Sequence, residues 1–156
     1  MKPTPSGWPR ISSSLVYANP GPAIDWLCRA FGFVVRIRID GEGGQVEHSE
    51  LDFGSGHSPD ESSRGDGLIM VAGVKPEKFP HRKSPTDLGG ANTQNLFVYV
   101  DDIEAHFNRA KNAGATIVSE PKTVDYGDGY WKDRSYECVD IGGHHWWFAE
   151  RLETRG

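Results

Sequence analysis

The sequence has few cysteines, no excess of basic residues and no long apolar run, and each shortage argues against a class of protein. Cys28 and Cys138 are the two cysteines, and their spacing matches no metal-binding pattern. We expect reduced thiols of a cytoplasmic protein, in preference to a disulfide or a nucleophile. With 17 basic and 22 acidic residues the net charge is -5, so nucleic acid is not an expected partner.

A membrane is not an expected partner either, because no apolar run approaches the length that spans a bilayer. Residues 1–10 contain Pro3, Pro5 and Pro9 but no apolar core, so we expect a tail and not a signal peptide. Hydrophobic residues make up 37% and charged residues 25% of the chain, which is typical of a soluble globular protein. Its 156 residues allow one ordinary domain or two small fused modules.

The first half of the chain predicts one helix among four strands. Apolar residues at helical spacing predict the helix at 23–31. Glycine-rich residues 41–44 predict a hairpin turn, and residues 54–67 form a polar loop without periodicity. The expected strands lie at 11–18, 33–40, 45–53 and 68–72.

The second half repeats this order. A strand at 95–100 leads into a helix that begins at Asp101 or Asp102. The segment Leu15-Val-Tyr-Ala-Asn19 resembles Phe97-Val-Tyr-Val-Asp101, which supports a duplication. The later strands are expected at 115–124, 131–140 and 144–152. The resulting division is a tail at 1–10, a first module at 11–73, a linker at 74–91, a second module at 92–152 and a tail at 153–156.

The last expected strand carries two histidines and two tryptophans after a Gly142-Gly143 turn. Side chains alternate between the two faces of a strand. One face therefore holds His144, Trp146 and Phe148, and the other holds His145, Trp147 and Ala149. We expect the first face to be backed by a helix and the second to look into a cavity.

These features together resemble the vicinal oxygen chelate superfamily, which has the glyoxalase, bleomycin-resistance and extradiol-dioxygenase fold. The resemblance covers residues 10–152 and rests on the doubled βαβββ order, on Val100-Asp101-Asp102, on Ala113-Gly114-Ala115 and on the Asp140-x-x-Gly143-His144-x-Trp146-x-Phe148 ending. The ending is more similar to the glyoxalase-like and bleomycin-resistance branches than to true glyoxalase I, and Ile141 replaces the family's usual proline. The resemblance implies an α+β fold of two modules that form a half-barrel sheet around a cleft, with helices on the outer face.

Metal-using members of this superfamily place one ligand on the first and one on the fourth strand of each module, typically His or Gln and then Glu. The corresponding positions here are Ser12, Met70, Asn95 (or Gln94, after a shift of one residue) and Trp147. A hydroxyl, a thioether, an amide and an indole do not hold a catalytic divalent metal. We therefore expect no metal and no other cofactor.

A cleft of this kind would be aromatic and weakly polar, and would bind a planar or cationic small molecule by burial, stacking and cation–π contact. The alternative is that the same rings pack a closed core. The hairpin residues Tyr130 and Trp131 would contact either the ligand or a second subunit of a homodimer. The expected ligand-binding residues are Trp147, Phe97, Tyr99, Asn95, Ser12, Met70, His145, Tyr130 and Trp131.

Three functions remain open at this point. The first is a metal-free binding protein of the drug-sequestering kind. The second is a lyase, isomerase or dioxygenase with a rearranged site that uses His145, Glu150 or Gln94. The third is a structural or regulatory dimer without a small ligand. Of the other histidines, His48 and His106 are expected to face solvent.

Overall fold

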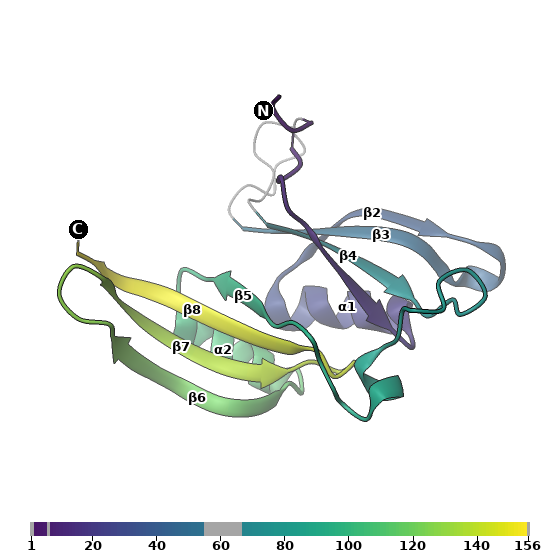
Figure 1. Cartoon of the computed structure of the whole chain (residues 1–156). Helices are drawn as coiled ribbons and strands as arrows, with labels where there is room; N and C mark the ends of the chain where they lie inside the picture. The colour runs from purple at the N-terminus through teal and green to yellow at the C-terminus, as the bar shows by residue number, and fades with distance from the viewer. Residues whose placement is uncertain (1, 6, 55–66, 156) are drawn as a thin grey trace.

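The computed structural model describes residues 2–5, 7–54 and 67–155, and has two four-stranded sheets and two α-helices (Figure 1). The polar loop expected at 54–67 lies almost entirely outside the described residues. Strand order is β1-β4-β3-β2 in one sheet and β5-β8-β7-β6 in the other. In each sheet the first and fourth strands pair in parallel, so both are βαβββ modules, as expected.

The helices and strands follow the sequence prediction, and their ends differ from it by at most three residues. The first module comprises β1 (Ser13–Tyr17), α1 (Pro20–Phe31), β2 (Val34–Asp40), β3 (Val46–Phe53) and β4 (Gly67–Gly73). The second comprises β5 (Leu96–Tyr99), α2 (Ile103–Asn112), β6 (Thr116–Asp125), β7 (Trp131–Val139) and β8 (His145–Thr154). The linker includes a short 3₁₀ helix, η3 (Pro85–Leu88).

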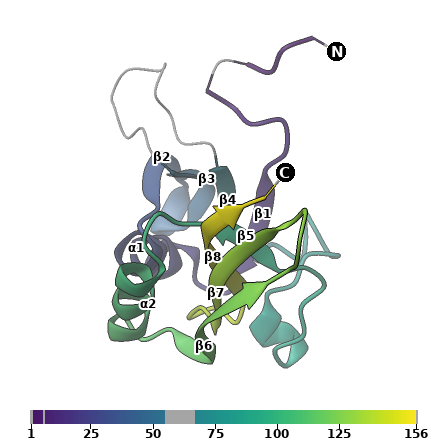
Figure 2. The ribbon, with the colours of Figure 1, turned by 90° about the vertical axis from the view of Figure 1, so that its left-hand side faces the viewer.

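Both helices lie on the same side of the sheets and contact each other (Figure 2). The phenyl ring of Phe31, at the end of α1, lies 5.2 Å from the ring of Trp146 and 4.8 Å from that of Phe148, both on β8. The indole of Trp26 donates a hydrogen bond of 2.8 Å to the carbonyl of Ala113 after α2. The two modules therefore share one core, and each sheet keeps a second face without a helix.

The turn before β8 joins the modules through Asp140, whose side chain is buried. One carboxylate oxygen accepts hydrogen bonds from the Tyr17 hydroxyl (2.5 Å) and the Trp146 indole (2.9 Å). The other accepts from the backbone N–H groups of Gly142 (2.8 Å) and His144 (3.0 Å). The residues that carry the family resemblance thus link β1 of the first module to β8 of the second.

The lack of space at this turn explains why residue 142 is glycine. A Cβ atom at Gly142 would lie 2.2 Å from the ring of Tyr17, which is itself buried. Close packing leaves no room for a larger residue at that position. The imidazole of His144 donates from Nε2 to the Val16 carbonyl at 3.0 Å, so His144 is a hydrogen-bonded core residue, as its strand face predicts.

No helix among the residues that the structure describes is long and apolar enough to cross a membrane.

Candidate functional site

The helix-free face of the second sheet carries exposed aromatic rings. Phe97 pairs with Trp147 in the parallel register of β5 and β8, and Tyr99 follows two residues later. Alternation places these three side chains opposite α2, and Phe97 and Tyr99 are 56% and 49% exposed. Their ring centroids lie 5.3 Å apart in an edge-to-face arrangement. We call Phe97, Tyr99 and Trp147 the aromatic face.

One end of the aromatic face is polar. The Arg151 guanidinium lies 5.1 Å from the ring centroid of Tyr99 and 4.9 Å from that of Trp131, and it forms an ion pair with buried Asp133. Partial burial and the neighbouring Asp133 carboxylate raise the pKa of the Tyr99 phenol above its usual value. Tyr99 therefore stays a neutral hydroxyl beside a fixed cation.

His145 lies on the same side of β8, as its strand position predicts. Its Nδ1–H donates to Glu137 at 2.9 Å, and Glu137 is the cross-strand neighbour of Trp147. A carboxylate in this position fixes the imidazole tautomer and leaves Nε2 as the acceptor. The pair is consequently a candidate general base next to the aromatic face.

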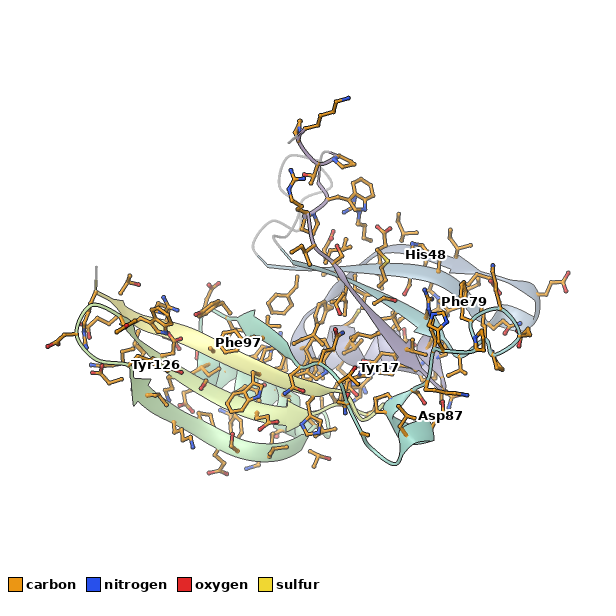
Figure 3. The ribbon with its side chains drawn as sticks, viewed as in Figure 1. Tyr17, His48, Phe79, Asp87, Phe97 and Tyr126 are labelled. Carbon is orange, nitrogen blue, oxygen red and sulfur yellow. The ribbon has the colours of Figure 1, made fainter. Side chains whose placement is uncertain are left out.

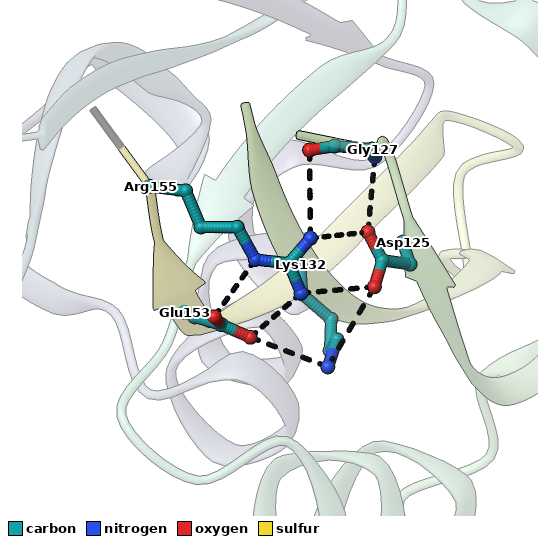
Figure 4. Close-up of polar contacts among 5 residues, drawn as sticks. All are labelled: Asp125, Gly127, Lys132, Glu153 and Arg155. Carbon is teal, nitrogen blue, oxygen red and sulfur yellow. Dashed lines mark hydrogen bonds and ion pairs between the residues drawn. The ribbon is translucent and has the colours of Figure 1, made fainter. Parts of the chain in front are cut away.

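The hairpin between β6 and β7 carries Tyr130 and Trp131, whose rings lie 5.9 Å apart. Tyr130 is exposed, and an ion cluster holds the hairpin to the end of β8 (Figure 4). In that cluster Arg155 donates two hydrogen bonds to Asp125, at 2.8 and 2.9 Å, and these hold the pKa of Asp125 down at about 2. The hairpin aromatics are therefore fixed at the same end as Arg151.

The remaining predicted residues lie elsewhere. Ser12 and Asn95 meet in a groove of about 380 Å³ between the starts of β1 and β5. Met70 lines a different cavity, of about 310 Å³, together with Ser14 and His48. Figure 3 places His48 on the first sheet, well away from Phe97. The nine predicted residues thus form three groups.

The metal positions of the superfamily do not fit a metal in this chain. Ser14 pairs with Met70, and Phe97 pairs with Trp147. Ser12 and Asn95 lie two residues before Ser14 and Phe97, so they belong to the same helix-free faces. None of the four metal positions supplies a carboxylate or an imidazole. Within the described residues, no three His, Cys, Asp or Glu side chains gather in a way that would hold a metal ion.

Two residues considered for a rearranged site have other contacts. The Glu150 carboxylate accepts a hydrogen bond of 3.0 Å from the backbone N–H of Ile103, so it caps α2 on the helix side of the sheet. The Gln94 side chain donates to the Ser13 hydroxyl at 2.9 Å, in the groove between β1 and β5. Of the three proposed residues, His145 alone lies on the aromatic side of the sheet.

The prediction for His106 was wrong. Its side chain is only 5% exposed, and its Nδ1 lies 2.8 Å from the Tyr136 hydroxyl while Nε2 lies 3.1 Å from the Phe31 carbonyl. Burial lowers the pKa of His106 to about 4, so the imidazole is neutral. His106 therefore belongs to the buried face of α2 although its side chain is polar, because these two partners satisfy its ring nitrogens.

Sequence reasoning also missed a buried charge cluster on the first sheet, formed by Arg36, Glu50 and Asp52. Arg36 is paired with Glu50 at 3.6 Å and with Asp52 at 3.7 Å, and its side chain is 5% exposed. The indole of Trp8 covers it, with the guanidinium carbon 3.4 Å from the ring centroid. Nothing in the sequence indicated that the tail covers this cluster.

Comparison with known proteins gives the following matches. The family model for the Glyoxalase/Bleomycin resistance protein/Dioxygenase superfamily matches residues 12–148. An uncharacterized protein of Mycobacterium bovis is 32% identical over 140 residues, which cover 88% of this chain and 80% of that protein.

Two solved structures extend the comparison. TioX from Micromonospora sp. ML1 superposes with a TM-score of 0.63 at 29% identity, over 90% of this chain and 94% of TioX. The fosfomycin resistance protein FosX from Listeria monocytogenes superposes with a TM-score of 0.57 over 90% of each chain. At 9% identity, the likeness to FosX shows the fold alone.

Proposed function

The chain belongs to the Glyoxalase/Bleomycin resistance protein/Dioxygenase superfamily, and from this premise we propose that it is a metal-free protein that binds a small planar or cationic molecule on its aromatic face. The observation that carries the proposal is the exposure of Phe97 and Tyr99 beside Trp147 on a sheet face without a helix. Exposed rings gathered on one face are a common feature of ligand and partner sites.

The chemistry of this face favours flat or positively charged ligands. Trp147 and Phe97 offer π faces for stacking, and such contacts add to the burial of apolar area. The carboxylate of Glu137 lies on the same sheet face, whereas that of Asp133 is already paired with Arg151, and the net charge of the chain is -5. A cation near these rings therefore gains both cation–π and Coulomb attraction.

A second copy of the chain would complete the site. One open sheet face cannot enclose a ligand on its own, whereas ligand sites typically bury most of the ligand surface. A homodimer that covers Phe97, Tyr99 and Tyr130 would bury three exposed rings and close the space above Trp147.

The free thiols of Cys28 and Cys138 suit a reducing compartment such as the cytoplasm.

The binding proposal is tested with Trp147→Ala and a panel of planar cationic dyes, titrated by fluorescence. Removing the indole takes away a stacking surface, so affinity for any dye that binds saturably should fall about tenfold or more. Phe79→Ala is the matched control, because it removes a ring that lies over the other sheet and should leave the affinity within twofold. Equal affinity of the Trp147→Ala and wild-type proteins for every dye would contradict the proposal. The number of subunits is measured separately by native mass spectrometry.

An enzyme of the same superfamily is the second candidate, and the Glu137–His145 pair is the observation in its favour. If the bound molecule is also transformed by proton transfer, His145→Gln should lower turnover about 100-fold, because an amide cannot act as the base. The affinity for the ligand should change less than threefold, since the Trp147 indole that stacks on the ligand is retained. Turnover that survives in His145→Gln would rule this pair out as the base.

A further inference from the structure

A cavity of about 310 Å³ lies on the helix-free face of the first sheet, under the start of the linker. Ser14 on β1 and Met70 and Ala72 on β4 form its sheet side, and His48 on β3 adds an edge. The linker side consists of Lys75, Lys78, Phe79 and Arg82. We call this space the linker cavity; Figure 3 shows Phe79 and His48 on this part of the molecule.

The linker cavity has a net positive charge although the protein is acidic, because three lysine and arginine side chains line it against the single carboxylate of Glu47. Residues 75–83 contain four lysine and arginine side chains and one glutamate, a net charge of +3 with His81 neutral. Since the whole chain carries -5, the rest of the chain carries -8. A basic cavity on an acidic surface attracts anions selectively to one place.

The cations that line the cavity differ in how they contact Glu47, the one carboxylate in its lining. Lys75 forms an ion pair with Glu47, and this hydrogen bond lowers the pKa of Glu47 below its usual value, with a smaller contribution from the charge of Lys78. The Lys78 ammonium lies 5.5 Å from the Phe79 ring centroid, and the Arg82 guanidinium carbon lies 4.2 Å from it. In the part of the chain that the structure describes, neither of these two cations forms an ion pair. An ammonium and a guanidinium at one ring are therefore available to an anion.

We propose that the linker cavity binds the oxyanion group, a carboxylate or a phosphate, of a small molecule. Lys78 supplies a point charge and Arg82 a planar fork of N–H donors, which together suit such a group. Met70 and Ala72 give an apolar surface for the carbon part, and the Ser14 hydroxyl is a neutral donor at the sheet side. The volume is at the low end for ligand sites, so the molecule is small. The linker cavity shares no residue with the aromatic face.

The test is a titration with inorganic phosphate, phenyl phosphate and benzoate, with uncharged benzyl alcohol for comparison. Binding is followed by calorimetry at physiological salt and by backbone amide NMR shifts. We expect saturable binding of one anion per chain, shifts gathered at residues 75–82, and no saturable binding of benzyl alcohol. A preference for the phosphates or for benzoate then identifies the group that the cavity takes.

Matched variants separate a built site from a diffuse positive potential. Lys78→Ala and Arg82→Ala should each weaken binding about tenfold, because each loses one charge-assisted contact. Lys83→Ala removes the same charge from the same segment but does not line the cavity, so its effect should be less than twofold. Ala72→Met should weaken binding by filling the space without a change of charge.

Other outcomes overturn the inference. If Lys83→Ala weakens binding as much as Lys78→Ala, the attraction is diffuse and there is no site. If the amide shifts lie outside residues 75–82, or none of the anions saturates, the linker cavity is not the binding place. Trp147→Ala should leave anion binding unchanged, so this result is independent of the test of the aromatic face.

Discussion

Replacing Asp140 by asparagine is expected to lower the free energy of unfolding by about 3 kcal/mol, because the amide cannot replace both carboxylate oxygens. One oxygen accepts from Tyr17 and Trp146, and the other from two backbone N–H groups. In the Asp140→Asn variant, either orientation of the amide places its NH₂ group against two donors. At least two buried donors then lose their acceptor.

The measurement is urea unfolding with a thermal melt alongside. For a chain of this length, a loss of about 3 kcal/mol corresponds to a fall in Tm of about 6–12 °C. Asp128→Asn is the matched control, since Asp128 is exposed in the hairpin and its change should stay within about 0.5 kcal/mol. Equal stability of the two variants would show that Asp140 does not hold the modules together.

Replacing Arg36 by methionine should lower the free energy of unfolding by about 3–5 kcal/mol, which is typical when one partner of a buried ion pair is removed. The apolar length of the side chain is kept, but buried Glu50 and half-buried Asp52 lose the guanidinium, and only the His48 imidazole, 3.2 Å from Glu50, stays beside them. The two ion pairs, at 3.6 and 3.7 Å, are longer than good hydrogen bonds. The loss of stability should still be large, because Glu50 stays buried after the guanidinium is removed.

A double variant separates charge from packing at this cluster. Adding Glu50→Gln to Arg36→Met should recover part of the lost stability, because one fewer carboxylate stays unpaired. Arg29→Met is the control for loss of a positive charge; Arg29 is exposed in the last turn of α1, so a loss of only about 0.3–0.5 kcal/mol is expected. If the second substitution adds to the first as a further loss, the cluster is held by packing and not by charge.

The fold can be predicted from the sequence because the same order of strands and helix occurs twice. Period-two alternation in β8 correctly assigned Trp146 and Phe148 to the core and Trp147 to the opposite face. The repeat correctly predicted two βαβββ modules. The alternation depends on neighbouring residues of one strand, and the repeat depends on the order of short segments along the chain, so neither needs knowledge of tertiary contacts.

The arrangement of the site is less accessible to this reasoning. Strand alternation tells which face Met70 and Trp147 occupy, but it does not fix how the two sheets sit relative to each other. The linker cavity and the cover over Arg36 depend on irregular segments, the linker and the tail, that have no periodicity to read. For His106, only its partners Tyr136 and Phe31, both distant in sequence, explain why a polar ring is buried.

The ring of Phe31 has a consequence for how a ligand enters. It belongs to the first module but packs on Trp146 and Phe148 of the second, so a hinge motion between modules would pull buried rings into water. Exposing each such ring costs about 2–3 kcal/mol. The duplicated halves therefore behave as one cooperative body, and a ligand would reach the sheet faces without a hinge motion between the modules.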